Sequence, residues 1–208
     1  MFFSRYGAIL KCNIQFHSTP QYFYEKNPLF GISLKLIYLW EKIKKMEEVL
    51  QKYASKKVQS HGSQVIQAGR NTSETWTKNS SIKLQTLKQE IQNSKYILKL
   101  TNNWDENGAL PISPMIYDSA IRFLQNYTLF IFKKYKTIIE TPSINPVNNG
   151  SIDLEWHTPN ARLLVNIRDT QNAYYYGDQH KNINSIKGSI SFETIENFFA
   201  VWMTKLAR

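Results

Sequence analysis

The stretch that decides the fold reads SIDLEWHTPNARLLVNIR and runs from Ser151 to Arg168. Apolar and polar residues alternate along both of its halves, and a period of two is typical of β-strands with one buried face. Pro159 and Asn160 lie between the halves and suit the central positions of a tight turn. The sequence therefore predicts an antiparallel hairpin.

The predicted turn also sets the register of this hairpin. With Pro159 and Asn160 at the tip, Trp156 stands opposite Leu163, and two further apolar pairs follow along the strands. These pairs are Leu154 with Val165 and Ile152 with Ile167. One face of the hairpin is then wholly apolar. The other face carries mainly polar side chains, namely Asp153, Glu155, His157, Arg162, Leu164, Asn166 and Arg168.

Further strands are expected on either side of the hairpin. The stretch NAYYYG, residues 172–177, predicts a third strand in which Tyr175 faces away from Tyr174 and Tyr176. The stretch TPSINPVNNG, residues 141–150, contains two prolines and predicts an edge strand or a loop. Together these elements predict a small antiparallel sheet of three to four strands.

Helices are predicted where apolar residues recur at steps of three and four. One covers about residues 83–98, and the next begins at Pro114 with Ser113 as its N-terminal cap. A last helix is expected to begin near Ser191. Because helices and strands are segregated along the chain, the expected fold class is α+β, with helices covering one face of the sheet and an N-terminal helical appendage.

The N-terminal part differs from the rest of the chain in composition. An apolar stripe from Leu36 to Tyr53 predicts an amphipathic helix, while Ser, Thr, Asn, Gln and Gly dominate the stretch that follows it. The expected organisation is a basic appendage over 1–57, a polar linker over 58–81 and a compact α+β domain over 82–208. The stripe would pack on a core or on a partner helix, which includes the option of an oligomer.

Positive charge is concentrated in the same part. The chain has a net charge of +10, and 12 of its 26 Lys and Arg but only 5 of its 16 Asp and Glu precede residue 82. A basic segment of this kind binds nucleic acid by releasing counterions, or it serves only to keep the protein in solution. The candidate nucleic-acid-binding residues are Lys42, Lys44, Lys45, Lys56 and Lys57.

Several classes of protein are disfavoured by the sequence. Cys12 is the only cysteine, so no internal disulfide can form, and no stretch approaches the roughly 20 apolar residues of a membrane helix. Motifs of common hydrolases, nucleotide-binding loops and zinc sites are missing, so we expect no cofactor and no metal. A cytoplasmic bacterial protein is favoured, and the lack of acids before Glu25 makes organellar import the alternative.

The loop LTNNWDENGALPIS, residues 100–113, is a candidate binding surface. Gly108 suits a left-handed turn, the indole N–H of Trp104 can reach a backbone carbonyl, and Asp105 can accept backbone N–H groups. These residues therefore make either a well-bonded turn or a polar platform for a partner. With the N-terminal stripe, the candidate partner-binding residues are Leu36, Trp40, Ile43, Leu50, Trp104, Asp105 and Asn107.

An enzymatic alternative rests on the polar face of the hairpin. Asp153, Glu155 and His157 could bind a metal or act as an acid–base pair in a small hydrolase or nuclease. Alternate residues of a strand lie about 6.6 Å apart, which is wide for one shared metal. A solvated sheet face with ordinary charge pairs is the simpler interpretation. The three consecutive tyrosines add the option of base stacking, against their ordinary preference for strands.

The loop and the hairpin together resemble a known family. The stretches NWDENGALPIS and PSINPVNNGSIDLEWHTPNARLLVNI are similar to a widespread family of uncharacterised bacterial proteins that share an Asn-Trp-Asp-x-x-Gly-Ala loop and a Gly-x-Ile-x-Leu-Glu-Trp strand. The resemblance covers about residues 84–178 and implies an accessory role in a toxin–antitoxin or phage-defence context, and no catalytic activity comes with the family. We therefore expect a non-enzymatic protein that docks a protein partner, and nucleic acid through its basic N-terminal part.

Overall fold

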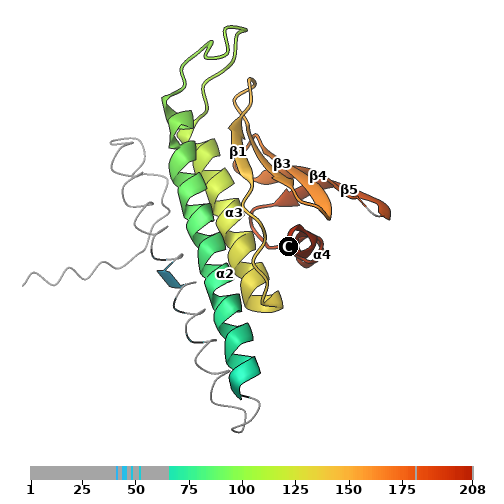
Figure 1. Cartoon of the computed structure of the whole chain (residues 1–208). Coiled ribbons are helices and arrows are strands. Elements are labelled where there is room, and N and C mark those ends of the chain that lie inside the picture. The colour runs from blue at the N-terminus through green and yellow to red at the C-terminus, as the bar shows by residue number, and fades with distance from the viewer. Residues whose placement is uncertain are drawn as a thin grey trace, which may run out of the picture. The chain divides into compact units, whose positions relative to one another are not determined.

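The computed structural model describes residues 41, 44–45, 48, 52, 66–180 and 182–207 (Figure 1). All elements named below lie in the unit that spans Lys45–Arg208. None of the described helices is long and apolar enough to cross a membrane. The helical elements are α2 (Ile66–Asn93), η2 (Ser94–Lys99), α3 (Pro114–Tyr135), α4 (Asn197–Met203) and η3 (Thr204–Leu206). The strands are β1 (Ser143–Pro146), β2 (Ile152–His157), β3 (Ala161–Ile167), β4 (Asn172–Gln179) and β5 (Asn182–Ser191).

The strands form one antiparallel sheet in the order β1-β2-β3-β4-β5, so the fold is α+β. The predicted hairpin is confirmed as β2 and β3, and its register is as expected, with Trp156 opposite Leu163 and Leu154 opposite Val165. The stretch before residue 150 supplies the edge strand β1. The predicted count of three to four strands is wrong, because the sheet has five.

The additional strand is β5, whose sequence NINSIKGSIS does not alternate in the usual way. Its isoleucines recur at steps of three and four, and Gly188 stands at an inward-facing position opposite Tyr175. A Cβ atom at Gly188 would lie 2.9 Å from the Tyr175 hydroxyl oxygen, so the tyrosine ring fills the place of an apolar side chain. The helix predicted from near Ser191 accordingly begins later, at Asn197.

The apolar face of the sheet, called the inner face here, is covered by α3 and α4. Trp156 is only 1% exposed, and its indole Nε1 donates to the carbonyl oxygen of Glu140 at 2.8 Å. The Tyr175 ring lies 4.6 Å from that of Phe199, which joins β4 to α4. Other residues buried in this core are Leu124, Ile131, Ile152, Leu154, Leu163, Val165, Ile167 and Met203.

Helix α3 begins as predicted and packs against α2. The Ser113 hydroxyl accepts from the backbone N–H of Met115 at 3.3 Å, and Pro114 occupies the first turn, where its missing N–H is harmless. The Tyr117 hydroxyl lies buried within hydrogen-bonding distance of the Ile91 carbonyl (3.1 Å) and the Ser94 hydroxyl (2.9 Å). These contacts hold the C-terminal end of α2 against α3.

The start of α2 differs from the prediction. The expected helix over 83–98 is an α-helix from residue 66 that ends in the 3₁₀ turn η2, so the predicted linker over 58–81 is helical from residue 66 onward. Ser, Thr and Asn are weak helix formers, but the propensity of a single residue is a small energetic term. The composition of residues 66–81 therefore predicted a linker where the structure has a helix.

The two edge strands of the sheet, β1 and β5, differ in what they contact. At β1 the backbone N–H of Ile144 donates to the Glu90 carboxylate of α2 at 3.2 Å. Lys83 of α2 pairs with Glu140, just before β1, at 3.0 Å. The Glu90 carboxylate thus occupies one backbone N–H of β1 that a strand of another chain would otherwise use. On the opposite side, β5 pairs only with β4 within the described residues.

Candidate functional site

Two of the candidates in the basic N-terminal part fall on described residues. Lys44 and Lys45 are both helical and exposed. The neighbouring described positions Glu41, Glu48 and Lys52 are also helical and exposed, in agreement with the polar side of the predicted helix. The candidates Leu36, Trp40, Lys42, Ile43, Leu50, Lys56 and Lys57 lie outside the described residues.

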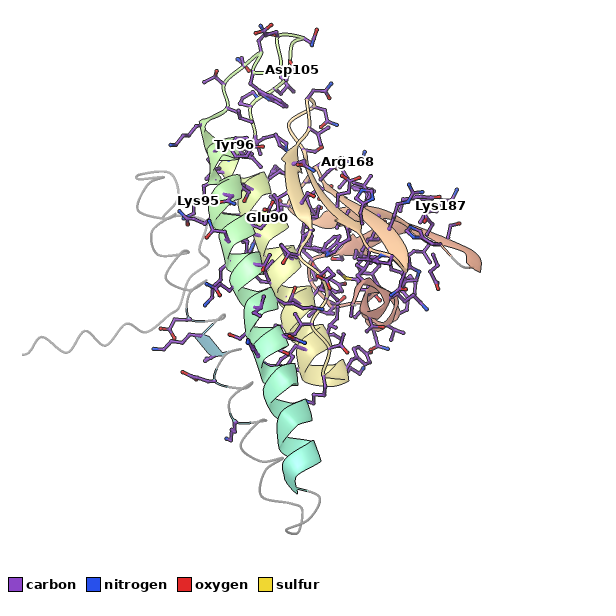
Figure 2. All side chains as sticks on the ribbon, viewed as in Figure 1. Glu90, Lys95, Tyr96, Asp105, Arg168 and Lys187 are labelled. Atoms are coloured by element: carbon purple, nitrogen blue, oxygen red, sulfur yellow. The ribbon has the colours of Figure 1, made fainter. Side chains whose placement is uncertain are left out.

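The loop between η2 and α3 is held by its own side chains. One carboxylate oxygen of Asp105 accepts from the backbone N–H groups of Asn107 and Ala109, both at 2.9 Å. These hydrogen bonds stabilise the charged carboxylate and lower the pKa of Asp105 below its ordinary value of 3.8. Figure 2 shows Asp105 at the end of the molecule where this loop lies. Asp105 therefore serves as an acceptor that shapes the turn.

Four further residues give the loop its shape. The Trp104 indole Nε1 donates to the Leu110 carbonyl at 3.0 Å, as its sequence position suggested. The side-chain oxygen of Asn103 accepts from the Gly108 N–H at 2.7 Å. Positive φ angles occur at Gly108 (90°), as predicted, and also at Asn103 and Glu106 (62° each). The last two have no clear sequence signal, although Asn tolerates this conformation better than most residues.

This loop contacts the turn between β1 and β2. The Leu110 N–H donates to the Asn148 carbonyl at 2.7 Å. Gly150, in the same turn, has a φ of +84°, and a Cβ atom there would lie 3.5 Å from the Pro111 carbonyl oxygen. The loop 100–113 and the turn between β1 and β2 therefore meet in space.

Replacing Asp105 by asparagine is expected to destabilise the protein at neutral pH. The substitution removes the charge from an acceptor of two backbone N–H groups, and hydrogen bonds to a charged acceptor are the stronger ones. Because the folded-state pKa lies below the unfolded value of 3.8, this stability is present above that value and is lost as the pH falls through the folded pKa. Unfolding measured at neutral pH and well below pH 3.8 should show a difference that shrinks with acid.

The matched control is Glu106→Gln, in the same loop. Its side chain is exposed and accepts no hydrogen bond from another described residue, so this change should have little effect at either pH. A loss for Asp105→Asn that stays constant across the pH range would contradict the role of its charge.

The second candidate surface is the outer face of the sheet, opposite the inner face. Its side chains are exposed or half-buried, and no described helix covers it. Figure 2 shows Arg168 and Lys187 on the sheet, away from Glu90 and Tyr96 on the helical side. The outer face carries Asp153, Glu155, His157, Arg162, Leu164, Asn166, Arg168, Tyr174, Tyr176, Asp178, Lys187 and Ser189.

The acids on β2 are bonded to their neighbours. The Asn166 amide donates to the Asp153 carboxylate at 2.7 Å, and the Glu155 carboxylate lies 2.8 Å from Nε2 of His157. Burial raises the pKa of Asp153, the Asn166 hydrogen bond partly offsets this, and repulsion from Glu155 adds to the rise. Among the described residues there is no group of three or more His, Cys, Asp or Glu that could hold a metal.

The other half of the outer face, on β3 to β5, is aromatic and cationic. The Arg168 guanidinium carbon lies 3.7 Å from the centre of the Tyr174 ring. Tyr176 is 50% exposed and stands between Leu164 and Lys187 on the neighbouring strands. Arg162 pairs with Asp178 at 3.0 Å, and this bond raises the pKa of the guanidinium. The sequence predicts that Tyr174 and Tyr176 share one face, but only the pairing of β4 with β3 brings Tyr176 opposite Leu164 and Tyr174 opposite Asn166.

A small pocket lies between α3 and the segment that follows β5. Its volume is about 60 Å³, and Arg122, Tyr127 and Phe192 are among its lining residues. Ligand pockets usually have volumes of about 300–1,000 Å³, so this pocket is too small for such a ligand.

No family model, no curated protein and no solved structure matches this chain. Function is therefore inferred from the chain's own residues. Of the two candidate surfaces, the loop directs its hydrogen bonds inward, to its own backbone. The outer face directs aromatic and charged groups outward.

Proposed function

We propose that this chain is a non-catalytic binding protein and that the outer face of the sheet is its contact surface. The observation that carries this proposal is the outer face itself. It extends over all five strands, and an apolar and an aromatic side chain, Leu164 and Tyr176, stand at its middle. Partly exposed aromatic side chains are enriched at protein contact surfaces, because they bury a large area at a small cost in conformational entropy.

The carboxylates support a binding role over a catalytic one. Asp105 accepts from two backbone N–H groups, Asp153 accepts from Asn166, and Glu155 is bonded to His157. General acid–base chemistry requires such groups to reach the reacting atoms of a bound substrate, and active sites usually lie in a concave pocket. Here Asp153 and Glu155 lie on an open sheet face.

The accessory role implied by the family resemblance agrees with this proposal. An accessory protein in a toxin–antitoxin or phage-defence context would act by docking on a partner. The basic N-terminal part, with Lys44 and Lys45 exposed, would be a second, electrostatic contact site.

Copurification of the tagged full chain from its own cells tests the proposal. The double variant Leu164→Ser with Tyr176→Ser should lose most of the protein or nucleic acid that copurifies with the wild type. The matched control is Ile82→Ser combined with Tyr96→Ser, since these two side chains are 50% and 51% exposed and lie on the helical side. The control double variant should retain the copurifying molecules.

Two outcomes would contradict the proposal. One is equal retention of the copurifying molecules by both double variants, with both shown to be folded by circular dichroism. The other is a hydrolytic activity of the wild-type chain that Glu155→Gln or His157→Asn abolishes.

A further inference from the structure

Charges are unevenly distributed over the outer face. Asp153 and Glu155 lie on β2, towards the β1 edge. The half formed by β3, β4 and β5, with Arg168 directly after β3, carries the aromatic–cationic patch, which we define as Leu164, Arg168, Tyr174, Tyr176 and Lys187. A ligand that is both anionic and aromatic would match this patch.

The two tyrosine rings set the spacing of such a ligand. Tyr174 and Tyr176 are alternate residues of β4 on the same face, so their side chains leave the strand about 6.6 Å apart. Stacked bases of a duplex strand rise by only about 3.4 Å. Two neighbouring bases can therefore lie on these rings only when they are unstacked, as in a single strand.

The cations of the patch are available for phosphates. Among the described residues the outer-face ion pairs join Arg162 to Asp178 and His157 to Glu155, and they include neither Arg168 nor Lys187. The guanidinium of Arg168 lies on the Tyr174 ring, and this layered arrangement leaves its N–H groups free to donate to phosphate oxygens. Lys187 stands beside Tyr176 on β5.

We propose that the aromatic–cationic patch binds single-stranded nucleic acid. Two successive bases stack on the Arg168–Tyr174 layer and on Tyr176, and Arg168 and Lys187 contact the backbone. This inference rests on the proposed function, because it names the ligand of the same outer face. An acidic peptide would pair with Arg168 and Lys187, but it has no bases to stack on the rings of Tyr174 and Tyr176.

Binding of a fluorescein-labelled oligothymidylate or oligouridylate to the full chain tests this inference. Tyr176→Ala should weaken the affinity about tenfold, since one stacked base is worth about that much or more. Arg168→Gln combined with Lys187→Gln should reduce the slope of log affinity against log salt by about 1.4, the value for two contacts to a single strand. A duplex of the same length should compete poorly.

The matched controls lie on the helical elements η2 and η3, outside the outer face. Tyr96→Ala removes a tyrosine of nearly the same exposure, 51% against 50% for Tyr176. Lys99→Gln combined with Lys205→Gln removes two exposed lysines. These controls account for binding through the basic N-terminal part, which every variant retains. Equal affinities and slopes for the patch variants and their controls would overturn the inference, and so would a preference for duplex.

Failure of this inference is distinguishable from failure of the proposed function. If the patch variants bind oligonucleotides like the wild type, yet Leu164→Ser with Tyr176→Ser abolishes copurification of a protein, the outer face binds protein and only the inference is overturned. If copurification is also unchanged, the proposed function fails with it.

Discussion

Replacing Trp156 by alanine should lower the free energy of unfolding by about 3–5 kcal/mol, the usual loss for a large aromatic residue of a core. Trp156 is 1% exposed on the inner face, opposite Leu163 of β3. Its indole also donates to the Glu140 carbonyl, which the truncation would leave without this donor. Urea unfolding of the full chain, followed by circular dichroism, measures the loss.

Two companion variants separate the causes of this effect. Trp156→Phe keeps most of the volume but removes the hydrogen bond to Glu140, so a loss of about 1–2 kcal/mol is expected. Trp104→Ala removes an indole that is only half-buried in a loop and should have a much smaller effect than Trp156→Ala. Equal losses at the two tryptophans would contradict the assignment of Trp156 to the core.

The hairpin at the centre of the sheet could be predicted because its information is local. Alternation of apolar residues defines the faces, and the Pro159-Asn160 turn defines which residues pair. The same holds for the start of α3, where Ser113 and Pro114 act on their own backbone. It also holds for Trp104 and Asp105, whose hydrogen bonds end within six residues.

The features that could not be predicted depend on residues far apart in the chain. Gly188 interrupts the apolar pattern of β5 because the Tyr175 ring occupies its space. The Leu110–Asn148 hydrogen bond joins the loop to the β1–β2 turn across 38 positions. The aromatic–cationic patch arises only when β3, β4 and β5 pair, since its members come from all three strands.

Gly177→Ala tests the closest of these long-range contacts and should lower the free energy of unfolding by about 1–3 kcal/mol. A Cβ atom at Gly177 would lie 2.6 Å from Cη2 of Trp202 in α4 and 3.1 Å from Cδ1 of Leu163. The indole is rigid and buried, so α4 must shift to admit one methyl group. Gly188→Ala is the matched control in the next strand. Its nearest contact is the hydroxyl at the tip of the half-buried Tyr175, and we expect a smaller loss there.

Trp202→Phe should relieve the clash at Gly177, because phenylalanine lacks the outer ring atoms that crowd this position. The Trp202 Nε1 has no hydrogen-bond partner among the described residues, so this substitution gives up no such bond. In a double-mutant cycle the two changes should therefore be less destabilising together than their sum, by about 1–2 kcal/mol. Strict additivity, measured by urea unfolding, would show that the helix does not rest on the Gly177 backbone. The packing of α4 on the inner face of β4 would then need another explanation.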